Sequence, residues 1–253
     1  MKSYLVLLLS LILAGCAGQT VSPTDKSTQG AAEAYTQLGM QYLRNGDAVN
    51  AKSAFQRASE IDKNAVSAYN GLAMAFQIEQ EPVLAEQYFE KAISIAPDSA
   101  MLRNNFGAFL FSQERYPEAC KQLGRATEDP FYNRRAQAFE NLGRCYLLID
   151  RSDAAEHAFE RSLKLNPGRV LPILELSALA LEKDDIELAV TYFEQFSQMV
   201  DAKQIDHNAK SLWLGVQIAR IQNKAVNAAT YGLILKNLYP ESNEYRQYKE
   251  SSR

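Results

Sequence analysis

The side chains that most often carry out chemistry are scarce in this sequence. The chain of 253 residues contains two histidines, three cysteines and one tryptophan. It has no pair of histidines at helical spacing, no Cys-x-x-Cys motif and no glycine-rich phosphate loop. His157 follows a glutamate on an amphipathic helix, and His207 lies in a polar connection, so neither is expected to be catalytic. The sequence therefore predicts a protein that is not an enzyme and that needs no metal, cofactor or small-molecule substrate.

Runs of one charge are also absent. The 27 basic and 30 acidic residues are interspersed and give a net charge of −3. Nucleic-acid binding needs a basic patch or stripe, so a nucleic-acid partner is not expected. The hydrophobic content of 47% is typical of a folded protein. Only 12 glycines are present, and Ala, Leu, Glu, Gln and Lys are plentiful, which favours helices.

The one long apolar run, Tyr4–Ala14, lies at the N-terminus and follows Lys2. It is too short to span a bilayer, which needs about twenty apolar residues, and it fits the core of a signal peptide. The run ends in Leu-Ala-Gly before Cys16. This segment resembles the signal of bacterial lipoproteins, in which the cysteine thiol receives a lipid before cleavage. The resemblance implies a signal peptide over residues 1–15 and lipidation of Cys16; the alternative is an ordinary secretory signal that happens to end in cysteine.

The residue after this cysteine is Ala17. In lipoproteins of bacteria with two membranes, Asp at this position usually retains the protein at the inner membrane. The resemblance therefore implies a lipid anchor on the periplasmic face of the outer membrane, where each buried methylene of the acyl chains contributes about 0.8 kcal/mol. Residues 16–31 are polar and lack periodicity, which predicts a flexible tether.

From residue 32 onward the sequence repeats with a period of about 34 residues, which is typical of tetratricopeptide repeats (TPRs). Each unit is expected to form two antiparallel helices, with small residues where the helices cross closely and large residues in the adjoining gaps. We expect an all-α TPR solenoid of about six helix-turn-helix units over residues 32–241, coiled as a right-handed superhelix, and a polar end or capping helix over residues 242–253. The alternative is a non-repeating helical bundle with the same apolar faces. The repeated positions include Leu38, Gly39 and Phe55; Leu72, Ala73 and Phe89; Gly107 and Leu123; Leu142, Gly143 and Phe159; Leu176, Ser177 and Phe193; and Leu214 and Gly215, whereas Gly232 stands where an aromatic residue is usual.

The first helices of such an array line its concave face, and the residues left there after packing are unusually apolar. Methionine adapts to varied apolar partners, and exposed apolar patches commonly mark binding sites. Two asparagines recur at one repeat position, where an amide can both donate to and accept from a peptide backbone. We therefore expect a polypeptide partner; the alternatives are contact with an adjoining helix, or the tether lying in the groove. The candidate partner-binding residues are Thr36, Met40, Leu43, Asn70, Met74, Ile78, Asn104, Ala108 and Phe111.

Two cysteines remain besides the one in the signal segment. Cys120 is expected on the second helix of the third unit and Cys145 on the first helix of the fourth, and these helices are neighbours in a TPR stack. An oxidising periplasm permits a disulfide, which would close a loop of about 25 residues and stabilise the fold by roughly 3 kcal/mol. Two small buried thiols are the equally weighted alternative.

Three segments give the sequence a more specific resemblance. They are LRNNFGAFLFSQERYPEA (102–119), AFENLGRCYLL (138–148), and SLWLGVQIAR followed by AATYGLILKNLYPES within residues 211–242. Together with the lipid signal and the number of repeats, they resemble the type IV pilus biogenesis and stability lipoproteins, the TPR pilotins that serve the outer-membrane secretin. The resemblance implies a lipoprotein that binds secretin subunits, holds them at the outer membrane and favours their assembly into the ring through which the pilus is extruded. It also implies that the groove of the first repeats is the contact.

Two other functions fit the repeats alone. A TPR lipoprotein can act as an adaptor of a peptidoglycan synthase or hydrolase, or as a subunit of the machinery that inserts outer-membrane proteins. Only the first and third of the quoted segments speak against them. The step served within pilus biogenesis, the secretin segment bound and the stoichiometry are left open.

Overall fold

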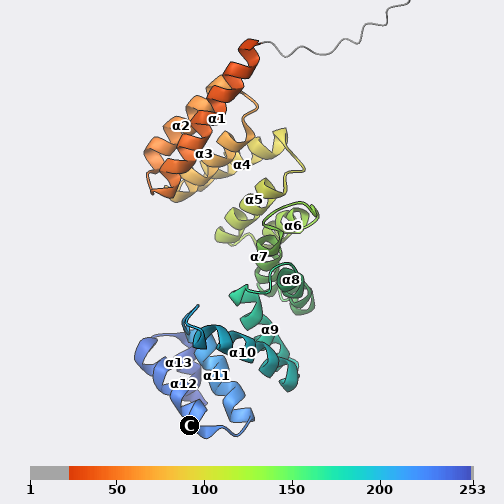
Figure 1. Ribbon diagram of the computed structural model, residues 1–253, viewed down its shortest axis with the longest axis vertical. Coiled ribbons are helices and arrows are strands. Elements are labelled where there is room, and N and C mark those ends of the chain that lie inside the picture. Colours follow the sequence, from red (N-terminus) through yellow and green to blue (C-terminus); the bar gives the residue numbers. More distant parts are fainter. Residues whose placement is uncertain (1–22, 252–253) are drawn as a thin grey trace, which may run out of the picture. The chain divides into compact units, whose positions relative to one another are not determined.

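The structure is a computed structural model that describes residues 23–251 (Figure 1). The predicted signal peptide, the lipidation site Cys16 and the start of the tether lie outside the described residues. Within the described range the chain is helical and contains no strand, which confirms the predicted all-α class. The chain divides between Glu81 and Pro82 into two compact units, α1 to α3 and α4 to α13. The helices are α1 (Pro23–Arg44), α2 (Ala48–Ile61), α3 (Val66–Ile78), α4 (Pro82–Ile95), α5 (Ala100–Ser112), α6 (Tyr116–Ala126), α7 (Arg135–Leu147), α8 (Ser152–Leu165), α9 (Val170–Glu182), α10 (Ile186–Asp201), α11 (Ala209–Ile221), α12 (Ala225–Leu238) and α13 (Asn243–Glu250).

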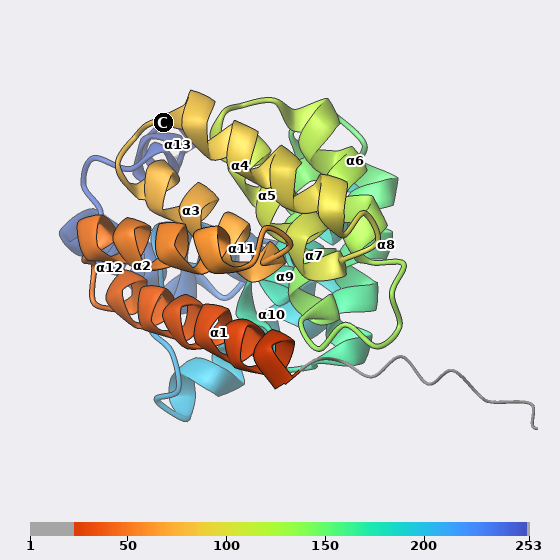
Figure 2. The same cartoon turned by 90° about the horizontal axis from the view of Figure 1, so that it is seen from above.

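The core of the first unit centres on the ring of Phe55, which is fully buried. Helices α1 and α2 lie side by side, and α3 packs against both (Figure 2). A Cβ atom at Gly39 would lie 2.6 Å from this ring, and one at Gly71 would lie 2.4 Å from it. Two glycines on two helices therefore make the space that one phenylalanine fills. The small-and-large pattern predicts the contact of Gly39 with Phe55, and the contribution of Gly71 is seen only in the structure.

The start of α1 corrects the predicted tether. Helix α1 begins at Pro23, so the part of the tether predicted over residues 23–31 is helical. Proline is favoured in the first turn of a helix, because its fixed φ suits the helix and its missing N–H has no partner there. Ala32 is buried, so the helix is nucleated by packing from this residue onward. Extending a nucleated helix towards the N-terminus through polar residues costs little free energy per residue. Polar residues on every face leave no hydrophobic periodicity, so the sequence pattern did not reveal these nine residues of helix, about two and a half turns.

The second unit contains four pairs of consecutive helices that pack on each other: α5 with α6, α7 with α8, α9 with α10, and α11 with α12. In α7, a Cβ atom at Gly143 would lie 2.5 Å from the ring of Phe159 on α8. In α9 the corresponding residue is Ser177, whose buried hydroxyl donates to the carbonyl oxygen of Ala189 at 2.7 Å. In each pair a small residue on the first helix thus faces the second helix. The space beside Gly143 is filled by the bulky side chain sixteen positions later, Phe159.

The turns that join first helices to second helices share one backbone feature. Each contains a residue in the left-handed region, which is costly for residues other than glycine. Glycine occupies this position only in the first repeat. These residues are Gly46 (φ 77°), Gln80 (61°), Glu114 (59°), Asp150 (56°), Asp184 (59°) and Asn223 (59°), and they recur at nearly the repeat period.

Helix α12 packs with an offset of one residue, as the late alanine in its sequence indicates. Ala228 and Gly232 are buried, whereas Asn227, at the position where the other second helices bury alanine, is exposed. The aromatic ring at the crossing with α11 comes from the preceding residue, Tyr231, which a Cβ atom at Gly215 would meet at 2.9 Å. Tyr248 of α13 packs on Gly232 itself, where a Cβ atom would lie 2.5 Å from the tyrosine ring. Residues 243–250 are therefore a helix that packs on α11 and α12.

Candidate partner-binding surfaces

In the first unit, the candidate residues lie on α1 and α3, which contact each other. Met40 and Leu43 on α1 and Met74 on α3 are half-buried, and Ile78 at the end of α3 is 54% exposed. Thr36 is also half-buried, and its hydroxyl donates to a backbone carbonyl of its own helix at 2.8 Å. The first unit thus presents partly accessible methionine and aliphatic side chains from two first helices.

The two recurring asparagines are buried, contrary to the expectation that they face a partner. Asn70 is 4% exposed and Asn104 is 5% exposed. The Asn104 side-chain oxygen accepts from the Asn141 amide at 3.1 Å, and the Asn70 amide lies 3.5 Å from the Met74 sulfur. Buried amides require partners, and here the fold supplies them. Asn104 therefore joins α5 to α7, and Asn70 contacts Met74 within α3. Because both side chains are buried, the prediction that their amides grip a partner's backbone is wrong for this structure.

The two other candidates in the second unit, Ala108 and Phe111 on α5, line a pocket of about 90 Å³ with Asn141 and Arg144 of α7. The Arg144 guanidinium lies 5.0 Å from the centre of the Phe111 ring, and Tyr116 meets this ring edge-on at 5.4 Å. The pocket therefore offers an aromatic face with a cation beside it. We name it the Phe111 pocket.

Arg144 is the functional candidate that the sequence prediction missed. It lies 36 residues after Ala108, and the fourth repeat is shifted by two residues, so it occupies the same repeat position. The repeat pattern contains the signal that identifies it, because this position in the fourth repeat carries an arginine next to the apolar candidates of the third repeat.

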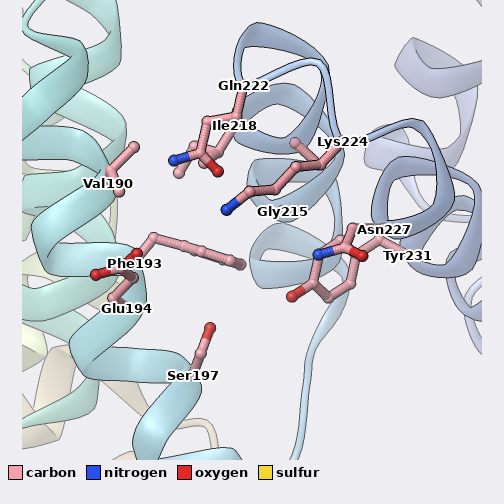
Figure 3. A pocket seen from close by; sticks show the side chains of 11 residues that line it. Val190, Phe193, Glu194, Ser197, Gly215, Ile218, Gln222, Lys224, Asn227 and Tyr231 are labelled. Carbon is pink, nitrogen blue, oxygen red and sulfur yellow. The ribbon is translucent and has the colours of Figure 1, made fainter.

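A second pocket, of about 120 Å³, lies among α10, α11 and α12 (Figure 3). Its walls carry Glu194 and Ser197 from α10, Lys224 before α12, and the rings of Phe193 and Tyr231. Burial raises the pKa of Tyr231 above its ordinary value. The pocket forms where α12 is offset, and no sequence pattern predicted it. Its volume is below the roughly 300 Å³ at which ligand sites usually begin, so it suits a few waters or one side chain.

The histidines do not form a catalytic arrangement in the described residues. His157 is exposed on α8. His207 packs with its ring centre 5.4 Å from Phe196 and 5.5 Å from Tyr231, and its Nδ1 lies 3.1 Å from the Ser211 hydroxyl. Burial lowers the pKa of His207. Residues 23–251 contain no group of three His, Cys, Asp or Glu side chains placed to hold a metal ion, and no helix among them is long and apolar enough to cross a membrane.

Cys120 on α6 and Cys145 on α7 are joined by a disulfide in the structure. Their Cα atoms are 5.5 Å apart, within the range of ordinary disulfides. Both residues are buried. The bond therefore links the third repeat to the fourth within the core, beside the Phe111 pocket, whose α5 and α7 walls belong to the same two repeats.

Comparison with known proteins agrees with this architecture. Two family models described as tetratricopeptide repeats match residues 29–100 and 98–167. The type IV pilus assembly protein PilF of Pseudomonas aeruginosa is 38% identical over 251 residues, which cover 98% of this chain and 98% of that protein.

Two solved structures are similar over most of the chain. The structure of Pseudomonas aeruginosa PilF has a TM-score of 0.83 and 37% identity, and the match covers 89% of this chain and 99% of that one. The structure of PilW, described as a widely conserved type IV pilus biogenesis factor, has a TM-score of 0.71 and 28% identity, and the match covers 86% and 97%. The predicted TPR fold and the resemblance to a pilus biogenesis family are thereby confirmed. This chain belongs to the family of the type IV pilus assembly protein PilF.

Proposed function

We propose that the protein is a non-catalytic lipoprotein of type IV pilus assembly that binds the outer-membrane secretin through its first helices. In this proposal Cys16 carries the lipid and holds the protein on the periplasmic face of the outer membrane. Binding then promotes the localisation and multimerisation of the secretin, and hence pilus biogenesis or stability. The 38% identity to a type IV pilus assembly protein over nearly the full chain is the observation that carries the assignment.

The surface that supports binding is apolar and lies on the first helices. Met74 and Ile78 offer adaptable and aliphatic contacts in the first unit, and the Phe111 pocket offers an aromatic face in the second. A few buried anchors usually provide most of the binding free energy of an interface. A secretin segment with apolar side chains that docks on these residues would be shielded from aggregation.

The proposed mechanism is physical. Each acyl chain adds about 0.8 kcal/mol of membrane affinity per buried methylene, and a bound secretin subunit shares that affinity. The lipid therefore determines the membrane at which the complex is held, and the repeats determine which protein is bound. No covalent bond of the secretin needs to be made or broken.

The test is capture of the secretin from cells by purification in detergent. Met74→Glu and Phe111→Glu each place a charge on the proposed contact, so we expect both to abolish capture and to leave the helical content unchanged. The matched control is Val226→Glu, because Val226 is 78% exposed on the second helix α12. Normal secretin multimers, surface pili and twitching motility in both variants would show that the assigned surface is wrong.

The anchor is tested separately with Cys16→Ser, which removes the lipid acceptor. We expect this variant to bind secretin but to leave it outside the outer membrane. The same purification separates the alternatives, because a cell-wall synthase or hydrolase, or a component of outer-membrane protein insertion, would copurify in place of the secretin.

A further inference from the structure

A larger groove lies at the other end of the second unit, away from the residues assigned above. It has a volume of about 460 Å³ and is lined by α9, α11 and α13. Helices α9 and α11 are the first helices of the fifth and sixth repeats, and α13 follows the last repeat. Its volume is within the range of about 300–1,000 Å³ that is usual for ligand sites. We name it the C-terminal groove.

Helix α13 completes this groove and is held there by specific contacts. Tyr248 fills the space above Gly232, and its ring meets Trp213 edge-on at 6.5 Å. The guanidinium of Arg220 lies 5.4 Å from the Tyr248 ring centre and 6.0 Å from that of Trp213. Because these aromatic contacts fix one side of α13, its polar residues Glu244 and Gln247 line the groove.

The charge of the groove is negative. Its charged lining residues are Glu182, Lys210 and Glu244. The Lys210 ammonium already donates to Glu175 at 2.5 Å, which offsets its charge. Glu182 and Glu244 form no ion pair with any basic side chain among the residues that the structure describes. The groove therefore has two carboxylates that a basic ligand could neutralise.

The remaining lining residues suit a polypeptide. Leu181 and Leu214 supply an aliphatic floor, and the Trp213 indole supplies an aromatic surface on which the stem of a lysine or arginine can lie. The side-chain amides of Gln217 and Gln247 can both donate to and accept from a peptide backbone. We infer that the C-terminal groove is a second docking site, which binds a polypeptide segment with alternating apolar and basic side chains. This inference does not depend on the partner proposed for the first helices of the N-terminal repeats.

The groove contains its own reporter, because Trp213 is the only tryptophan of the chain. The purified protein is titrated with the peptide acetyl-Leu-Arg-Leu-Lys-Leu-amide while the tryptophan fluorescence is recorded. We expect a saturable change in emission that weakens as salt is added. The peptide acetyl-Leu-Glu-Leu-Glu-Leu-amide, with the same apolar residues, is expected to give none.

The double variant Glu182→Gln/Glu244→Gln should weaken binding of the basic peptide about tenfold, since it removes two solvent-screened charge pairs. The control Glu160→Gln/Glu187→Gln has the same change in charge on exposed residues of α8 and α10, and should bind as the wild type does. Glu182→Lys/Glu244→Lys should reverse the preference towards the acidic peptide. Equal binding of both peptides, no saturable change with the basic peptide, or wild-type affinity in the Gln variant would overturn the inference.

Discussion

Removal of the Cys120–Cys145 disulfide should destabilise the second unit by about 3.5 kcal/mol. The bond joins residues 25 positions apart. A cross-link restricts the unfolded chain by an amount that grows with the logarithm of the loop length, which for this loop gives about 3.5 kcal/mol at 25 °C. Both cysteines are buried where α6 packs on α7, so the lost constraint acts in the core between the third and fourth repeats.

The assay compares thermal unfolding, followed by circular dichroism, of three samples: the oxidised protein, the same protein with reductant, and Cys120→Ala/Cys145→Ala. For a chain of this length each kcal/mol corresponds to roughly 2–4 °C, so we expect the midpoint to fall by roughly 7–14 °C. Repeat arrays can unfold in segments, so the whole transition is compared as well as its midpoint. The reduced wild type is the control for packing lost in the alanine variant.

Mass measurement after alkylation is made first on protein isolated from cells without reductant. Two alkylated thiols without reductant would mean that the bond does not form, and the sequence alternative of two buried thiols would hold. Coincident transitions of oxidised and reduced protein would refute the loop-closure reasoning even if the bond is present.

Three further predictions concern the helix packing, the His207 ring and one turn. Gly143→Ala should destabilise the protein by about 1–3 kcal/mol in a denaturant titration, because the new Cβ atom would lie 2.5 Å from the Phe159 ring. Gly124→Ala, where the new Cβ atom would have no atom within 4 Å, should stabilise the protein by about 0.5–1 kcal/mol. Burial lowers the pKa of His207 from 6.5, so the unfolded chain binds the proton more tightly and the free energy of unfolding should fall as the pH drops below 6.5. His207→Phe should remove this contribution to the pH dependence, whereas the control His157→Phe should keep it. Unfolding midpoints measured between pH 7 and pH 5 test this. Glu114→Gly should raise the free energy of unfolding by up to about 1 kcal/mol, because Glu114 has a φ of 59°, where glycine is less strained. A denaturation midpoint that is unchanged or lower would contradict the strain assigned to this turn.

The sequence predicts the helix pairing, because the sizes of the side chains at the helix crossings determine which helices can pack together. The spacing of small and large residues, such as Gly143 and Phe159, predicts which helices pair, because a glycine and a ring can share one crossing only if they are opposite each other. The helix over residues 23–31 does not follow, because polar residues on every face give no periodic signal. The offset of α12 is visible in Ala228 and Gly232, but only the structure shows that Tyr248 of α13 packs on Gly232.

The site was predicted less completely than the fold. Repeat position identifies the first-helix residues that do not pack against the second helix of their own unit. It correctly predicts that Ala108 and Phe111 lie together, since both line one pocket. Repeat position does not show which of these residues the fold buries, as it buries Asn70 and Asn104. The C-terminal groove was missed because α13 belongs to no repeat, and a repeat pattern places no residue of it beside α11.

The central claim is that the first-helix surface contacts the secretin, and site-specific photo-cross-linking in cells tests it most directly. Phe111 is replaced by the photoreactive benzoylphenylalanine, and in a parallel strain Val226 is replaced in the same way. After irradiation we expect a covalent adduct with the secretin from position 111 and none from position 226. An adduct with a different protein from position 111, or equal secretin adducts from both positions, would contradict the claim.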